Sequence, residues 1–462
     1  MRASVASIVL TMLAGSGMAS IEVNPNPESL AASGSPMAVS MEELMEAKLS
    51  HREQDIASGV FDKDRYTAQA ATACINGKAG EYSCKNADLK GFIRHKDLGS
   101  RTRAGNDVWG WTSSTGREFG IVGHTDGVGF VEVLRDGSLR AMGRLPTQTT
   151  NNIWRDMKVI GNHAYIGSES RNHGLQIFDL MKLLTVNPKR PPTFDIHSDL
   201  TGHFTGFGSS HNIVVHEKSK MVYAVGTARN GACRGGLWMV DVSDPSNPRD
   251  AGCAAQDGYV HDAQCVTYKG PDAAHRGRLI CFCYNEKALT IVDVTEPGSP
   301  LQLSRTRYKG ATYTHQGWLT GDDQRFLLLD DEFDEVKRNG AAADGRTTTY
   351  IVDVSKLGKP VFTGFYKSPA KAIDHNQYVI DGLSYMSNYG SGLRVVNVTS
   401  VHAKSNGSGF KEVAFFDVRP EDDAKGGKVT FNGAWSVYPY FRSGHLLVNS
   451  IERGIFSVKL TI

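Results

Sequence analysis

The sequence predicts an all-β fold, a seven-bladed β-propeller of four-stranded antiparallel blades, from two repeating patterns. In the first pattern, a histidine and a following amide or acidic residue stand before an apolar run, and this pair returns every 50 to 60 residues. It occurs at His211-Asn212, His261-Asp262, His315-Gln316 and His375-Asn376. A sequence period of this length is typical of solenoids and propellers.

The second pattern is a nearly continuous apolar run that ends in Asp or Asn and also occurs once in each repeat. Strands of this kind are usually buried on both faces. We expect them at residues 175–180, 237–242, 289–294, 349–354 and 393–398. Turn residues separate them from other strand-like runs, so each repeat reads as four strands, for example 211–215, 221–226, 237–242 and 249–253. Four antiparallel strands in about 50 residues describe one propeller blade.

Seven repeats can be counted along the chain. Six begin near Arg155, His211, His261, His315, His375 and Asn432, and a weaker one spans residues 108–145. The last strand, residues 454–460, stands at the end of the chain, so the first repeat must close the ring against the last. We therefore expect the propeller to occupy residues 105–462.

The first 104 residues lack this pattern. Residues 1–19 read as a signal peptide, with Arg2, a short apolar run at 5–14 and small residues before Ala19. Residues 20–104 form an N-terminal extension, with a flexible leader (20–38), a helix (41–58) and an irregular part (59–104). The apolar run is too short to span a bilayer and no second long one follows, so we expect an exported, soluble protein without a transmembrane segment.

The seven cysteines suit an oxidising compartment. We prefer the disulfides Cys74–Cys84, Cys233–Cys253 and Cys265–Cys281, which leave Cys283 free, although the sequence alone does not fix the pairing. No Cys-x-x-Cys motif occurs, so a cysteine-bound zinc is disfavoured. Asn397 and Asn406 begin sequons that a eukaryotic secretory pathway could glycosylate. The net charge of +2 gives no indication of nucleic acid as a partner.

A set of short motifs in chain order carries a family resemblance. The motifs are Trp154-Arg-Asp156, Ser210-His-Asn212, residues 258–265 (GYVHDAQC), 313–319 (YTHQGWL), Asp330-Asp-Glu332, 373–377 (IDHNQ), 431–435 (FNGAW) and 451–454 (IERG). Over residues 72–460 the chain resembles the secreted LVIVD-repeat proteins, specifically the choice-of-anchor B family. The resemblance implies a propeller and export, and no established reaction. Unlike anchored members, this chain ends at Ile462 without an apolar tail or sorting motif.

The repeated polar residues predict a site at the mouth of the central channel. The innermost strand of each blade begins at one rim, so the four histidines should gather there with Arg155 and Asn432 in register. Loops between second and third strands should bring carboxylates beside them. The complete expected set is Arg155, Asp156, His211, His261, Asp262, His315, Asp374, His375, Asn432, Glu169, Glu286, Asp330, Glu332 and Glu452.

Two interpretations of this rim remain open. The histidines His211, His261, His315 and His375 could bind copper, zinc or iron, with Asp262, Asp374 or Glu332 orienting them or acting as a base. Alternatively, each histidine bonds the backbone of the next blade. We favour a secreted or cell-surface binding scaffold, a monomer with an extracellular ligand or protein partner, over a metal-dependent oxidoreductase or hydrolase. No catalytic residue can be assigned, and convergence of three imidazole nitrogens on one point would favour the metal.

Two further expectations concern acidic and aromatic residues. The run at 330–335 (DDEFDE) could bind calcium, but we favour a solvated loop with one or two carboxylates at the channel mouth. The six tryptophans should pack in blade cores rather than stack on sugars, with Trp318 and Trp435 equivalent in the repeat.

Overall fold

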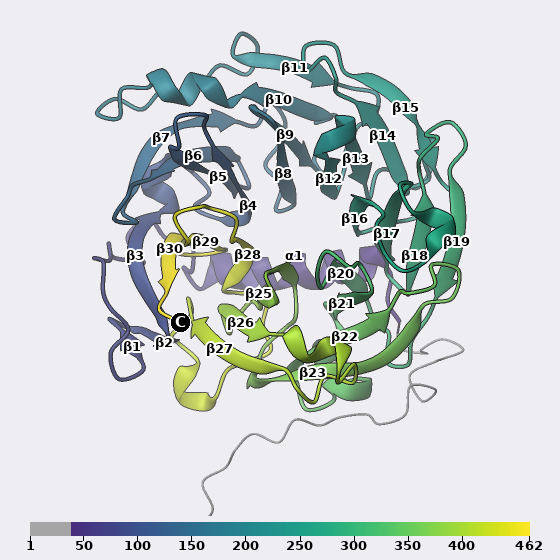
Figure 1. Ribbon diagram of the computed structural model, residues 1–462. Helices are drawn as coiled ribbons and strands as arrows, with labels where there is room; N and C mark the ends of the chain where they lie inside the picture. Colours follow the sequence, from purple (N-terminus) through teal and green to yellow (C-terminus); the bar gives the residue numbers. More distant parts are fainter. Residues whose placement is uncertain (1–37) are drawn as a thin grey trace, which may run out of the picture.

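The computed structural model of the chain, which describes residues 38–462, is a ring of seven antiparallel sheets around a central channel (Figure 1). This confirms the predicted seven-bladed propeller. The expected signal peptide and most of the leader, residues 1–37, lie outside the described residues. Among the residues that are described, no helix is both long enough and apolar enough to cross a bilayer.

Each of the first five blades has four strands in chain order from the channel outward. The first three blades are β4 (Gly105–Thr112), β5 (Glu118–His124), β6 (Gly127–Val133) and β7 (Leu139–Pro146); β8 (Arg155–Ile160), β9 (His163–Ser168), β10 (Leu175–Asp179) and β11 (Leu200–Phe204); and β12 (Asn212–His216), β13 (Met221–Val225), β14 (Leu237–Asp241) and β15 (Arg249–Ala254). The next two are β16 (Asp262–Thr267), β17 (Leu279–Asn285), β18 (Ala288–Asp293) and β19 (Leu301–Thr306); and β20 (Thr314–Leu319), β21 (Phe326–Asp331), β22 (Arg346–Asp353) and β23 (Val361–Lys371).

The last two blades include strands from the N-terminal part of the chain. They are β24 (Asn376–Ile380), β25 (Leu383–Ser387), β26 (Leu393–Asn397) and β27 (Lys411–Phe416), extended by β2 (Tyr82–Lys85) and β1 (Lys78–Ala79); and β28 (Ala434–Tyr438), β29 (His445–Ser450), β30 (Gly454–Leu460) and β3 (Ala87–Arg94). The helices are α1 (Met41–Ala57), α2 (Asp334–Lys337) and the short 3-10 turns His95–Leu98, Leu180–Thr185, Glu217–Ser219, Ala273–His275, Gly340–Ala342, Thr399–His402 and Asp423–Lys425.

The apolar runs predicted from the sequence are the third strands, β10, β14, β18, β22 and β26. Four or more consecutive residues of each are buried, since these strands lie inside a blade that is covered on both faces by its neighbours. The cores form between blades: Phe282 and Ile291 of one blade pack with Leu327 and Tyr350 of the next. The innermost strands contact one another in the order β4, β8, β12, β16, β20, β24, β28 and back to β4, so the ring is closed.

The propeller begins earlier than the expected residue 105. Strand β3 is the outermost strand of the last blade and pairs with β30, with Leu89 opposite Val458 and Phe92 opposite Phe456. The ring is thus closed by a strand from the N-terminal part of the chain, not by the first repeat packing alone against the last. The segment expected to be irregular, 59–104, also contains the β1–β2 hairpin, which adds to the sixth blade through Cys84 opposite Phe416.

The three expected disulfides, Cys74–Cys84, Cys233–Cys253 and Cys265–Cys281, are present. Within the described part of the chain, Cys283 alone has no disulfide, and it is buried. Cys265 and Cys281 are direct cross-strand partners in β16 and β17. Three disulfides are consistent with an oxidising, extracellular environment.

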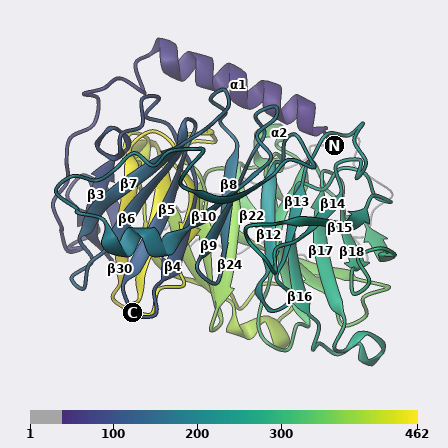
Figure 2. The ribbon, with the colours of Figure 1, turned by 90° about the horizontal axis from the view of Figure 1, so that it is seen from above.

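Helix α1 was expected and lies across one face of the ring (Figure 2). Its side chains Met41, Leu44 and Lys48 are buried at helical spacing, so one face of α1 packs on the propeller. The backbone N–H of Met41 donates to Glu286 Oε1 at 2.6 Å, and this bond fixes the start of the helix. Helix α1 therefore covers the rim at which the innermost strands begin.

Candidate functional site

Four histidines form a continuous stack under α1. The ring centroids of His211 and His261 are 4.2 Å apart, those of His261 and His315 4.1 Å, and those of His315 and His375 4.5 Å. Each residue stands at or next to the first residue of an innermost strand, and these strands are consecutive in the ring. All four are buried. At one end of the stack, His211 Nδ1 lies 2.6 Å from Glu169 Oε1.

Hydrogen bonds to backbone carbonyls orient two of these rings. His261 Nδ1 donates to the carbonyl of His315 at 3.0 Å, and His375 Nδ1 donates to the carbonyl of Trp435 at 2.6 Å. A carbonyl only accepts, so each proton stays on Nδ1 and each Nε2 keeps its lone pair. Burial lowers the pKa of His261, His315 and His375 well below the usual range, so the rings are neutral. Two of the imidazoles thus bond the neighbouring blade, as the second interpretation expects, and each also keeps a nitrogen with a free lone pair.

Glu332 lies where these free nitrogens converge, and it is fully buried. Its Oε2 is 3.5 Å from His315 Nε2, its Oε1 is 3.4 Å from His375 Nε2, and Tyr389 donates its hydroxyl to Oε1 at 2.5 Å. One donor atom each from His261, His315 and Glu332 lie within 4.8 Å of one another. Neither His261 Nε2 nor Glu332 Oε2 has a hydrogen-bond partner among residues 38–462. Two imidazoles and one carboxylate thus face a common point.

The cation at this point is Lys48, which sequence analysis did not identify. Its Nζ is 2.5 Å from Glu332 Oε1 and 5.1 Å from the centre of a Trp435 ring. The side chain of Lys48 is only 4% exposed, so α1 delivers a buried positive charge to the carboxylate. A void of about 30 Å³ lies beside Lys48 and Tyr389, and His261, His315 and Glu332 are not among its lining residues. Lys48 stands at helical spacing from Met41 and Leu44, which places it on the buried face of α1 but does not identify its partner.

The remaining expected rim residues have other partners. Arg155 is turned toward His173, with Nη1 2.8 Å from His173 Nε2, and does not join the stack. Asn432 bonds His51 of α1 at 2.8 Å, and Glu452 accepts from the backbone N–H of Gly433 at 2.9 Å. Glu286 holds the start of α1, as described above. Asn432 and Glu286 bond helix α1, while Arg155 and Glu452 bond groups within the blades, so none of them joins the histidine stack.

The acidic run is not the solvated loop that we expected. Asp330, Asp331, Asp334 and Glu335 are fully buried. They serve as acceptors inside the fold: Asp331 takes the backbone N–H groups of Thr312 and Tyr313, and Glu335 takes that of Thr348. Asp374 packs among them and accepts from Thr349 at 2.9 Å. Burial raises the pKa of these carboxyls, which opposes a cluster of free charges. Of the run, only Glu332 reaches the histidines.

A second buried histidine pair lies between the first and last blades. His124 Nε2 is 3.0 Å from His95 Nδ1, and His95 Nε2 donates to the carbonyl of Ser450 at 2.7 Å. His95 is fully buried, and burial lowers its pKa to about 4. It is therefore held neutral at physiological pH.

His95 should make the protein sensitive to acid. The unfolded state takes up the proton near pH 6.5 and the folded state only near pH 4, so stability is full above pH 6.5 and is lost as the pH falls toward 4. Between pH 7 and pH 5 we expect His95 to remove about 2 kcal/mol from the free energy of unfolding. Urea unfolding of the wild type, His95→Gln and the exposed-site control His197→Gln measures this. An unchanged pH dependence in His95→Gln would contradict it.

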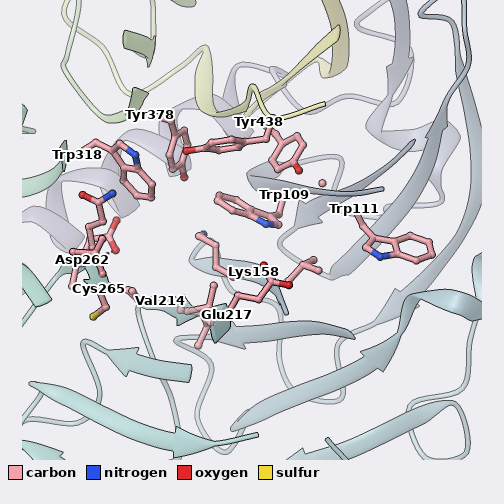
Figure 3. A pocket seen from close by; sticks show the side chains of 18 of the residues that line it. Trp109, Trp111, Lys158, Val214, Glu217, Asp262, Cys265, Trp318, Tyr378 and Tyr438 are labelled. Atoms are coloured by element: carbon pink, nitrogen blue, oxygen red, sulfur yellow. Dashed lines mark hydrogen bonds between the residues drawn. The ribbon is translucent and has the colours of Figure 1, made fainter. Parts of the chain in front are cut away.

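An open cavity within the described residues is lined by the innermost strands, and none of the four stacked histidines lines it (Figure 3 shows its side chains). It has a volume of about 490 Å³ and is lined mainly by residues of the innermost strands. Asp262, expected at the histidine rim, lies in this cavity, and Asp156 lies beside it in an ion cluster with Lys158. Burial raises the pKa of Asp262 to about 7.

The tryptophan expectation is incomplete for two residues. Trp109 and Trp318 pack against hydrophobic core residues, as expected, and they also line the cavity. Trp318 and Trp435 are also not equivalent, since Trp318 stacks edge-on with Tyr378 in the cavity while Trp435 contacts His375 under α1. Trp111 does pack in a core, with Phe119 and Phe130.

Fold and repeats together define the class of protein, a β-propeller that carries the LVIVD repeat. The family model described as LVIVD repeat matches residues 232–252, which contain β14. Among solved structures, the chain is similar to Kuenenia stuttgartiensis Hydrazine Synthase, with 10% sequence identity and a TM-score of 0.47 over 75% of this chain and 94% of that chain. A comparison with curated proteins finds no match.

Proposed function

We propose that the protein is an exported binding propeller that holds one transition-metal ion between His261, His315 and Glu332 beneath α1. The observation that carries the proposal is that one donor atom each of His261, His315 and Glu332 lie within 4.8 Å of one another, while His261 Nε2 and Glu332 Oε2 are buried without a hydrogen-bond partner in the described chain. An unpaired buried polar atom is unfavourable, and a bound ion would satisfy both. The Nδ1–carbonyl bond of His261 is the outer support that metal-binding imidazoles usually have.

The donor set selects the kind of ion. Two imidazoles and one carboxylate suit zinc, copper or iron, whereas calcium prefers a set of six or more oxygens. His375 Nε2, at 3.4 Å from Glu332 Oε1, is placed to supply a further nitrogen. Of the four histidines proposed from the sequence, His211 is left out of the metal site, because its Nδ1 is bonded to Glu169.

The space around the ion favours binding over catalysis. Lys48, Tyr389 and Trp435 close the site from the α1 side, and the void next to them is only about 30 Å³. That volume holds a water molecule and not an organic substrate. A metal-dependent oxidoreductase or hydrolase, the alternative function, needs room for a substrate at the ion.

Export is the second part of the proposal. Three disulfides support it, together with the signal-like residues 1–19 and the resemblance to the choice-of-anchor B family. If the cell glycosylates, Asn397 and Asn406 are the acceptor sites to test by mass spectrometry.

Metal analysis of the variant His315→Ala tests the function. Protein purified without an affinity tag should contain about one equivalent of metal or take it up on titration, and the variant should bind at least about a hundredfold more weakly. The exposed-site variant His402→Ala is the matched control, since its ring lies on the surface near Asp323. If the wild-type protein takes up no metal and the variant only melts at a lower temperature, the metal site is disproved. The histidines would then serve only to bond one blade to the next.

A further inference from the structure

The channel cavity has the size of a site for a small molecule. Its volume of about 490 Å³ falls within the range of pockets that bind metabolites and drugs. It is lined from β4, β8, β12, β16, β20, β24 and β28, whose first residues lie at the rim under α1. None of the four stacked histidines is among its lining residues. The cavity is therefore a second site, independent of the proposed metal.

One wall of the cavity is a group of aromatic side chains, which we call the aromatic wall: Trp109, Trp318, Tyr378, Tyr438 and Tyr440. Trp109 and Tyr438 have ring centroids 5.3 Å apart, and Trp318 and Tyr378 are 4.9 Å apart, both edge to face. Figure 3 shows the labelled rings arranged around the cavity. Mutual edge-to-face contacts hold the rings in place, so the wall is formed before any ligand arrives.

The charges in the cavity are unbalanced. Lys158 lies 2.6 Å from Asp156 Oδ1 and 3.2 Å from Asp107 Oδ2, so its charge is already matched by two carboxylates. Asp262 is a further carboxylate in the lining, and among the described residues its hydrogen bond comes from the backbone N–H of Ala263, at 2.7 Å. No Lys, Arg or His of residues 38–462 forms an ion pair with Asp262. Within the described chain, the cavity therefore has no cation of its own to pair with Asp262.

Aromatic faces and one unmatched carboxylate are the recognition elements of organic cations. The protein already places a cation on this wall, since Lys158 Nζ lies 4.6 Å from the centre of the Trp109 ring. An anionic ligand would meet the carboxyl of Asp262, while Lys158, the cation in the lining, is already paired with Asp156 and Asp107. We propose that the channel cavity binds a small organic cation, an amine or quaternary ammonium, with its charge toward Asp262 and its alkyl groups on the aromatic wall.

Choline and its neutral isostere 3,3-dimethylbutan-1-ol provide the test. The full protein is titrated with each in EDTA, and binding is followed by calorimetry and by the fluorescence of Trp109 and Trp318. Because EDTA removes the proposed metal, failure of one proposal leaves the other untouched. We expect saturable choline binding at least about tenfold tighter than that of the isostere.

Two variants localise the binding. Asp262→Asn should weaken choline binding about tenfold and leave the isostere unchanged, while Asp322→Asn, on an exposed loop, should change neither. Trp109→Leu should weaken both, and it serves as the second variant if Asp262→Asn folds poorly. Equal affinity for choline and the isostere, no binding of either, or saturable binding of cellobiose that Asp262→Asn leaves intact would each overturn the proposal.

Discussion

A chain that begins at Gly105 will fail to form a closed propeller. It lacks β3, and the last blade then ends at β30 with an unpaired edge at which Val458 and Phe456 lose their partners Leu89 and Phe92. Exposed strand edges of this kind promote aggregation. Because β3 also joins the two ends of the chain in one sheet, its loss opens the ring. We expect an aggregated product without a cooperative melting transition, measured by size-exclusion chromatography and circular dichroism.

A chain that begins at residue 67 is the matched control. It keeps β1, β2, β3 and the Cys74–Cys84 disulfide and lacks only α1 with the segment that follows it. It should remain monodisperse and unfold cooperatively at a reduced temperature, since the buried contacts of Met41 and Leu44 are lost. If the chain starting at Gly105 melts like this control, the closing role of β3 is disproved.

The sequence predicted the blades but not the strand that closes the ring, because that strand pairs with a partner far away in the sequence. Third strands such as β14 and β18 are buried on both faces, so their apolar runs are continuous and easily recognised. Strand β3 is an outer strand, buried only at alternate positions from Ala87 to Gly91, and its partner β30 stands at the other end of the chain. Nothing local in β3 indicates which sheet it joins.

The positions of the channel residues follow a rule that the sequence contains. Side chains alternate along a strand. In β4, Asp107 and Trp109 therefore share the channel side, and in β16 Asp262 and Gln264 do. The residue that follows each rim histidine thus begins a row that lines the channel, and Trp318 stands two positions after Gln316. Applied to every inner strand, this alternation would have placed Trp109 and Trp318 in the cavity.

The contact between Lys48 and Glu332 could not be inferred in the same way. It joins a helix at the start of the chain to a loop of the fifth blade, and neither segment belongs to the repeat at that point. Lysine and glutamate are rarely buried, so composition favours solvent exposure for both. Only the three-dimensional arrangement shows that α1 brings a cation to the carboxylate that faces His315 and His375.

The variant Lys48→Met will bind divalent metal far more tightly than the wild type while its metal-free form is less stable. A metal ion that approaches Glu332 must first break the buried pair with Lys48, and breaking such a pair costs about 3 kcal/mol. Removing Lys48 removes that cost from binding, so the affinity for zinc should rise about a hundredfold. The free energy of unfolding of the metal-free variant should fall by about 3 kcal/mol, for the same reason.

In the variant Lys48→Met, the affinity for zinc should rise and the stability of the metal-free protein should fall, and both changes have the same cause. Isothermal titration with zinc should show the tighter binding, and thermal melting should show a destabilised metal-free protein that added zinc restores, because a ligand of the folded state stabilises it. Lys337→Met is the control, since its pair with Glu43 is on the surface and contributes little. Destabilisation without a gain in affinity would mean that Lys48 and the ion do not compete for Glu332, and the ion would then have to bind elsewhere or not at all. Destabilisation with tighter binding would identify α1 as the element that sets how strongly the propeller holds its metal.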